Sequence, residues 1–314
     1  MGRFLLRRFG QAVGVLFLVT VVTFGLVHAL PGGPARAILG IRASPAAIRQ
    51  FDVANGYNKS LPVQYIDYIV NTVQLKFGFS YKNNESVGYL LARDLPKTAY
   101  LAGLALLFSI LIAIPLGIYQ AVRRGKADDY VLTAGSFIGY SMPSFWLALL
   151  LIAIFAVDLK LFPATAPQTV GVGGAISDPS AMVLPVATLT IIQVAAFSRY
   201  MRSSAIENLA QDYIRTARAK GARESAILFS HMLRNAILPI ITLIGLSIPT
   251  LLTGNLIVEQ VFNYPGAGLL YWNSAVSRDY PTLLAETVII GVFVIVGNLL
   301  ADLAYGVVDP RIRT

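Results

Sequence analysis

The chain has 314 residues, of which 56% are hydrophobic and 13% are charged. Soluble domains carry about 25% charged residues, so this composition excludes an ordinary soluble protein and favours a membrane protein. There is no cysteine, which excludes disulfides, thiolate metal sites and thiol nucleophiles. We expect the net charge of +9 to mark the cytoplasmic side of a membrane rather than a nucleic-acid surface.

Six stretches are long and apolar enough to be membrane-spanning helices, since a helix needs roughly 20 apolar residues to cross the hydrocarbon core. They are residues 9–30, 98–122, 130–157, 179–198, 236–258 and 282–301. The first stretch is too long for the apolar region of a signal peptide, and no A-x-A cleavage site follows it. We therefore expect it to be retained as a helix.

Basic residues alternate with these stretches in a way that predicts the orientation. They gather before the first stretch and in segments 123–126, 199–234 and 311–313, whereas the opposite short loops hold only Lys160 and Arg278. Because basic loops stay on the cytoplasmic side, both termini are expected in the cytoplasm.

The long outer segment, residues 31–97, is expected to form a small helical cap. Ser44 fits the N-cap of a helix, and Pro45 fits its first position. Residues 61–78 place apolar side chains three and four apart, which predicts an amphipathic helix. A second outer loop, residues 160–178, is rich in glycine, proline, threonine and alanine and is expected to be irregular.

The sequence thus predicts an all-α membrane protein with six transmembrane helices. Residues 1–30 form the cytoplasmic N-terminus and first transmembrane helix, and residues 31–97 the extracytoplasmic segment. Residues 98–314 form a core of five further transmembrane helices, which includes a cytoplasmic hairpin at 201–235.

Two acids stand inside the apolar stretches or at their ends, Glu286 and Asp302. We expect each to reach an interface or to pair with an arginine. An ion-driven transporter would carry a deeper acid or a proton relay, so their placement argues against that class.

Small and hydroxyl-bearing residues are plentiful in the third and fifth stretches. They either let helices pack closely or line a polar translocation path, and the residues alone leave both interpretations open. The candidates for the path are Ser136, Tyr140, Ser141, Ser144, Ser247, Thr250 and Asn255.

The cytoplasmic hairpin is the most polar part of the chain. Apolar residues at three-four spacing predict one helix over residues 205–220, and Gly221 suits the position just past its end. A second helix is predicted from about Arg223 to Pro239. The hairpin is either a positively charged loop lying on anionic lipid or a docking element for a cytoplasmic partner.

Motifs for catalysis are absent from the sequence. It contains no H-E-x-x-H, no G-x-S-x-G and no G-x-x-x-x-G-K-[ST], and its two histidines, His28 and His231, are expected on opposite sides of the membrane. We therefore predict a protein that is not an enzyme, with no catalytic, metal-binding or cofactor-binding residues of its own.

Several segments together resemble the permease subunits of bacterial dipeptide and oligopeptide ABC importers. The cytoplasmic segments DYIRTARAKG and RNAILP resemble the EAA loop of that family. Five further segments resemble the family in the same order along the chain: RRFGQAVGVLFLVTVVTFGLVHALPGGPA, LPVQYIDYI, SMPSFWLALLL, VEQVFNYPGAGLLYWNSAVSRDYPTLLA and NLLADLAYGVVDPRIR. The chain departs from the family pattern at Arg215, where an acid is usual, and in KFGFSYKNN, which lacks the usual acid near Lys76.

The resemblance implies a type I ABC importer permease fold in the bacterial inner membrane. It implies that a docking hairpin for an ATPase is formed by Thr216, Ala217, Arg218, Ala219, Lys220, Gly221, Arg223 and Glu224. It also implies the partners: a second permease subunit, two ATPase subunits or domains that bind ATP and Mg²⁺, an extracytoplasmic substrate-binding protein, peptide cargo and membrane lipid, with no nucleic acid.

Three alternatives stay open on the sequence. The same architecture serves relatives that import nickel or glutathione. A stand-alone secondary transporter and an intramembrane enzyme are the other classes, and the docking hairpin and the missing catalytic motifs argue against them.

Overall fold

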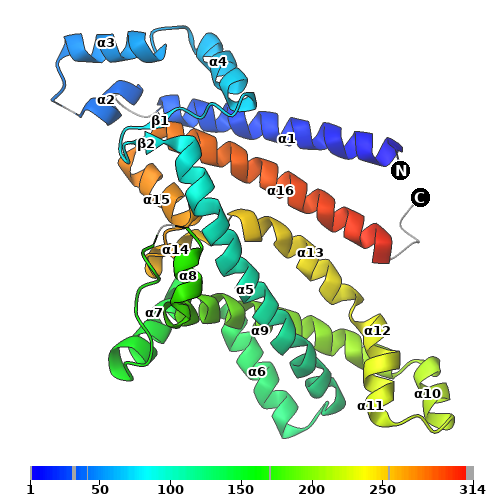
Figure 1. Cartoon of the computed structure of the whole chain (residues 1–314). Coiled ribbons are helices and arrows are strands. Elements are labelled where there is room, and N and C mark those ends of the chain that lie inside the picture. Colours follow the sequence, from blue (N-terminus) through cyan, green and yellow to red (C-terminus); the bar gives the residue numbers. More distant parts are fainter. Residues whose placement is uncertain (1, 30–32, 41, 170, 254, 309–314) are drawn as a thin grey trace.

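The structure is a computed structural model that describes residues 2–29, 33–40, 42–169, 171–253 and 255–308. Within these ranges, four helices are long and apolar enough to cross a membrane unaided. They are α1 (Gly2–Ala29), α5 (Val87–Val122), α9 (Pro179–Leu209) and α16 (Tyr280–Val308). Figure 1 shows α1 alongside α16, and α5 packed against α9.

Two further spans are bent rather than straight. The first joins α6 (Ala127–Ser141) to α7 (Ser144–Leu151) and the π-helix η1 (Ile152–Asp158), with a bend of 109°. The second joins α11 (Glu224–Ala226), the π-helix η2 (Ile227–Met232) and α12 (Leu233–Ala236) to α13 (Leu238–Thr253), with a bend of 49°. The described part of the chain therefore has four to six membrane spans.

The sharp bend after α6 follows from the sequence Met142-Pro143. A proline disfavours helical angles in the residue before it, and Met142 is extended, with φ −78° and ψ 126°. The span predicted over residues 130–157 is therefore divided into two helices at this proline. Because it lacks an N–H, Pro143 fits a position just before the new helix α7 begins.

Two of the candidate membrane-spanning helices extend beyond the ends that hydropathy predicts for them. Helix α5 begins eleven residues before position 98, where the Ser86 hydroxyl accepts a hydrogen bond from the Tyr89 N–H at 3.3 Å. Helix α9 continues eleven residues past position 198, to Leu209. Hydropathy ends a predicted span at the first charged residue, whereas the helix itself ends only where capping or packing stops it.

The outer segment contains α2 (Gly33–Leu39), α3 (Pro45–Asn55) and α4 (Leu61–Val73). The Ser44 hydroxyl accepts from the Ala47 N–H at 3.2 Å, so its predicted N-cap role is confirmed. Two short antiparallel strands, β1 (Phe79–Ser80) and β2 (Glu85–Ser86), correct the purely α-helical prediction. Strand β1 lies within the segment KFGFSYKNN, where the sequence departs from the family pattern, and β2 follows directly after it.

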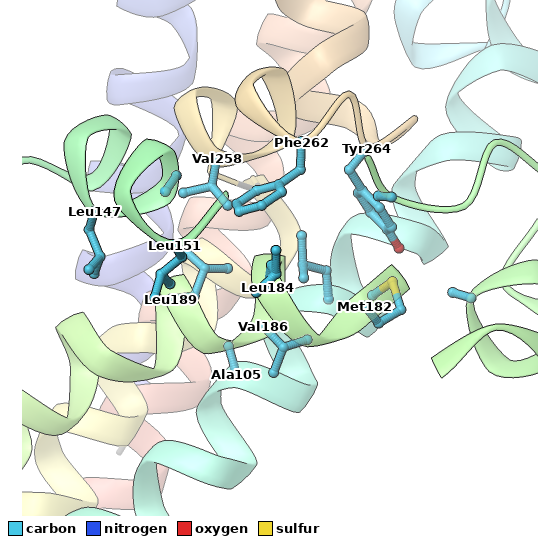
Figure 2. Packing of buried hydrophobic residues seen from close by; sticks show 14 residues of the cluster. Ala105, Leu147, Leu151, Met182, Leu184, Val186, Leu189, Val258, Phe262 and Tyr264 are labelled. Carbon is cyan, nitrogen blue, oxygen red and sulfur yellow. The ribbon is translucent and has the colours of Figure 1, made fainter. Parts of the chain in front are cut away.

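The loops on the outer side are partly ordered into short helices. Helix α8 (Gly173–Ser177) lies in the loop that was predicted to be irregular, and α14 (Leu256–Val261) and α15 (Ala267–Ser277) precede α16. Figure 2 shows Val258 of α14, and Phe262 directly after that helix, packed toward Leu184 of α9 and Leu151 of α7. This apolar cluster fixes the outer loop on the bent span.

The closest helix packing is between α5 and α9. A Cβ atom added to Gly117 would lie 2.6 Å from the Met201 Cβ and 2.7 Å from the Ser198 carbonyl oxygen. Only a glycine allows the two backbones to approach this closely. The contact holds the C-terminal part of α9, and with it the base of the hairpin, against α5.

Candidate functional site: the cytoplasmic hairpin

The hairpin consists of α10 (Asp212–Ala219), a turn, and the succession α11, η2 and α12. The single helix predicted over residues 205–220 is wrong, because α9 ends at Leu209 and α10 starts at Asp212. Gln211 between them is extended, with ψ 153°, and Asp212 places an acid in the first turn of the new helix. The break turns α10 away from the axis of α9 (Figure 1).

Gly221 forms the turn that the sequence predicts. Its φ of +79° lies in the left-handed region that glycine adopts without strain. The Gly221 N–H donates to the Arg218 carbonyl at 2.9 Å, and the Ala222 N–H donates to the Ala217 carbonyl at 3.1 Å. These bonds satisfy carbonyls at the end of α10 and reverse the chain toward α11.

The inner side of the hairpin is apolar and buried. Ile214 of α10 and Ile227 and Met232 of η2 are fully buried in one cluster, which also contains Ile118 of α5 and Met201 of α9. Burial of such side chains stabilises by about 1.5–3 kcal/mol each. The hairpin is therefore held rigidly on the ends of two long helices, and a force applied to it reaches them directly.

The outer side of the hairpin is polar and exposed. Arg218 donates from Nε to one Glu224 oxygen at 3.0 Å and from Nη2 to the other at 3.4 Å. Arg215 pairs with Asp212 at 3.3 Å, so the arginine that replaces the usual acid has a partner in its own helix. Among the residues predicted to dock, only Ala217 is buried; Thr216, Arg218, Ala219, Lys220, Gly221, Arg223 and Glu224 are exposed.

Similarity to a known family covers nearly the whole chain. Residues 113–314 match the family described as the binding-protein-dependent transport system inner membrane component, and residues 1–102 match its N-terminal counterpart. The chain belongs to this permease family.

Full-length relatives carry peptide-transport names. The permease is 40% identical to the oligopeptide transport system permease protein AppB of Bacillus subtilis (strain 168), with 100% of both chains covered. It is 37% identical to DppB, the dipeptide transport system permease protein of the same strain, with 100% of this chain and 98% of the relative covered. It is 34% identical to DppB of Escherichia coli (strain K12), with 99% and 98% covered.

A solved structure supports the fold. The structure of the MetNI methionine ABC transporter in inward-facing conformations matches with a TM-score of 0.54 and 18% identity, covering 70% of this chain and 97% of that one. The permease therefore has the fold of an ABC importer permease, with additional residues beyond the shared part.

The residues predicted to line a path lie in different surroundings. Ser136 is buried and donates to the Leu132 carbonyl at 2.9 Å, and its Oγ lies 3.4 Å from that of Ser198. Ser247 donates to the Leu243 carbonyl, and Asn255 accepts from the Val258 N–H as the N-cap of α14. Tyr140 and Ser141 are exposed and Ser144 is half-buried, while the side chain of Thr250 lies outside the described part.

The outer loop buries acidic residues that no sequence pattern singled out. Glu259 is fully buried and accepts from the Thr98 hydroxyl at 3.0 Å and from the Leu269 N–H, in the first turn of α15, at 3.1 Å. Burial raises the pKa of Glu259 to about 7, although these hydrogen bonds oppose the shift. Gly266 leaves room for the carboxylate, since a Cβ there would lie 2.5 Å from it.

The surroundings of Glu286 differ from those expected from the sequence. Its side chain is buried in α16, and neither carboxylate oxygen has a hydrogen-bond partner among the described residues. The expectation that it reaches an interface or pairs with an arginine is therefore wrong. The side chain of Asp302 lies outside the described part of the chain.

Proposed function

We propose that this permease is the membrane-spanning subunit of an ATP-driven importer of dipeptides or oligopeptides, and that its hairpin couples ATP hydrolysis to transport. The observation that carries the proposal is the two-sided hairpin, with a buried apolar face on α5 and α9 and an exposed charged face. The names of the full-length relatives support peptides as the cargo over nickel or glutathione.

The hairpin transmits movement from the ATPase subunit to the permease. Its exposed charges, at Arg218, Lys220, Arg223 and Glu224, meet an ATPase subunit, and its buried residues transmit movement of that subunit to α5 and α9. Since the chain has no phosphate-binding loop, ATP and Mg²⁺ bind to two partner ATPase subunits or domains. Membrane-spanning helices then rock between inward-open and outward-open states.

The remaining partners complete the assembly. A second permease subunit forms the translocation path together with this one, and an extracytoplasmic binding protein delivers peptide to the outer face. The basic residues near the N-terminus and in segments 123–126 and 199–234 support cytoplasmic termini and a hairpin on the side of the ATP. The path candidates Tyr140, Ser141 and Ser144 are at least partly accessible in the single chain, which supports a position toward the second subunit or the path.

The test compares two glycines that share a backbone conformation. Gly221 and Gly125 both have a φ of +79°, both stand in cytoplasmic loops, and a Cβ on either would meet no atom within 4 Å. Gly221→Asp is expected to abolish ATP-driven peptide uptake in proteoliposomes while the protein still inserts. Gly125→Asp has the same backbone strain outside the hairpin and is expected to retain uptake.

ATPase activity separates the possible outcomes. If the hairpin couples the two proteins, Gly221→Asp leaves ATP hydrolysis without transport or lowers its stimulation by the loaded binding protein. Normal uptake by Gly221→Asp would remove the docking role. If both variants lose peptide uptake equally, the loss is caused by backbone strain in the cytoplasmic loops.

A further inference from the structure

Arg199 is a cation within the helix bundle that has no acidic partner. Its guanidinium carbon lies 4.5 Å from the ring centroid of Tyr140 and 5.5 Å from that of Phe137. Among the described residues, no hydrogen bond or ion pair involves its side chain, which is half-buried. The aromatic faces hold the guanidinium by cation–π attraction and leave its N–H groups unused.

The acids of the neighbouring helix are already occupied. Asp129 accepts from both Nε and Nη2 of Arg202 at 2.7 Å, and also from the Gly125 N–H at 3.0 Å. Asp128 accepts from Arg123 and from the Tyr119 hydroxyl, each at 2.7 Å. Arg199 is thus separated from the ion pairs that neutralise the cytoplasmic ends of α5, α6 and α9.

The two rings that contact Arg199 lie well beyond the ion pairs at the start of α6. Phe137 and Tyr140 stand ten and thirteen residues from the start of α6 at Ala127, which is about 15–20 Å along the helix axis. Both rings belong to a candidate membrane span, α6 with the helix after it. A cation held against such a span faces a water-filled cavity or another protein group rather than lipid tails.

The two aromatic rings beside Arg199 are about half exposed in the single chain. The side chains of Phe137 and Tyr140 are 51% and 53% exposed, and no described segment covers them. Tyr140 is also among the path candidates, and Ser141 beside it is exposed. The cation and its two rings therefore lie on a surface that another subunit or the translocation path would cover.

We propose that Arg199 forms a carboxylate-binding subsite in the translocation path and that it receives the C-terminal carboxylate of the peptide. A guanidinium presents five N–H donors in a fixed fork that matches a carboxylate in a bidentate manner. Every peptide with a free C-terminus carries that carboxylate, whatever its side chains. The inference rests on the proposed peptide import and adds a residue that determines specificity.

The experiment measures ATP-driven uptake by the whole importer, with its partners, in liposomes. The substrates are one labelled tripeptide and its C-terminal amide. Arg199→Gln is expected to lower uptake of the free tripeptide about tenfold or more and to leave uptake of the amide near the wild-type value, while Arg199→Lys recovers part of the loss. Arg124→Gln is the matched control, because Arg124 is an exposed cytoplasmic arginine without an ion pair among the described residues.

A second measurement does not depend on what the binding protein accepts. Phenylglyoxal modifies accessible arginines, and mass spectrometry reports the modification of Arg199 in the detergent-purified importer. The free tripeptide at millimolar concentration is expected to protect Arg199, whereas the amide does not. Absence of protection by the free tripeptide would overturn the proposal.

Other outcomes identify another partner for Arg199. If Arg199→Gln lowers uptake of the free tripeptide and of the amide equally, the subsite is overturned. If the second permease subunit is lost from the variant on purification, Arg199 forms a contact between subunits. A defect that follows the content of phosphatidylglycerol in the liposomes, and not the peptide terminus, would assign the cation to a lipid phosphate. If the wild-type importer takes up neither peptide, the proposed function itself fails.

Discussion

The cytoplasmic hairpin exposes its charged side chains, whereas the outer loop between α13 and α16 buries its acids. Arg218 and Glu224 of the hairpin are 48% and 65% exposed, while Glu259 and Asp279 of the outer loop are at most 1% exposed. Apolar residues therefore hold the hairpin, and its charges remain available for a partner. In the outer loop a buried carboxyl group is itself part of what holds α14 and α15 together.

The largest effect is expected from removing an apolar residue that holds the hairpin. Ile227→Ala leaves a cavity in a fully buried site and should lower the free energy of unfolding by about 2–5 kcal/mol. Phe229→Ala, two residues away at a 60% exposed position, should change it by less than about 1 kcal/mol. Hydrogen exchange of residues 212–232 in the purified protein measures the difference, and equal effects would contradict apolar anchoring.

A somewhat smaller effect is expected from removing the buried acid of the outer loop. Glu259→Ala leaves the Thr98 hydroxyl and the Leu269 N–H without their acceptor and should cost about 1–3 kcal/mol. Glu224→Ala, which removes an exposed acid from the hairpin, is the matched control and should leave the melting temperature nearly unchanged. A similar drop in both variants would show that burial does not distinguish the two regions.

The same acid predicts how stability depends on pH. The folded pKa of Glu259, about 7, lies above its ordinary value of 4.5, so the protonated form favours the folded state. Its stabilising contribution is complete below about pH 4.5 and is lost as the pH rises through about 7. The melting temperature of the wild-type protein should fall more between pH 5 and pH 8 than that of Glu259→Gln, and parallel curves would contradict this assignment.

The smallest effect is expected from breaking the exposed ion pair of the hairpin. Arg218→Ala should cost less than about 1 kcal/mol, because both partners are hydrated and screened by salt. If the charges serve the ATPase, the variant should reduce ATP-driven uptake far more than it reduces stability. Unchanged uptake with a large loss of stability would reverse the contrast between the hairpin and the outer loop.

The sequence by itself determined the features that are encoded within a few neighbouring residues. Apolar runs of about 20 residues indicated the spans, Ser44 indicated a helix start, and Gly221 indicated the turn at the end of α10. Hydropathy, capping and left-handed turns depend on local side chains and backbone angles, so no knowledge of packing was needed. The segments that resemble the permease family added the expected position of the docking hairpin.

Only the tertiary structure decided which distant residues meet. From the sequence, Arg199 is expected in a loop because the apolar run ends at Ser198, but α9 continues and places it against Tyr140 and Phe137. The acceptor role of Glu259 likewise depends on Thr98, 161 residues away. Such contacts arise from the antiparallel packing of helices, whose register is set by close approaches such as that at Gly117 and not by any local pattern.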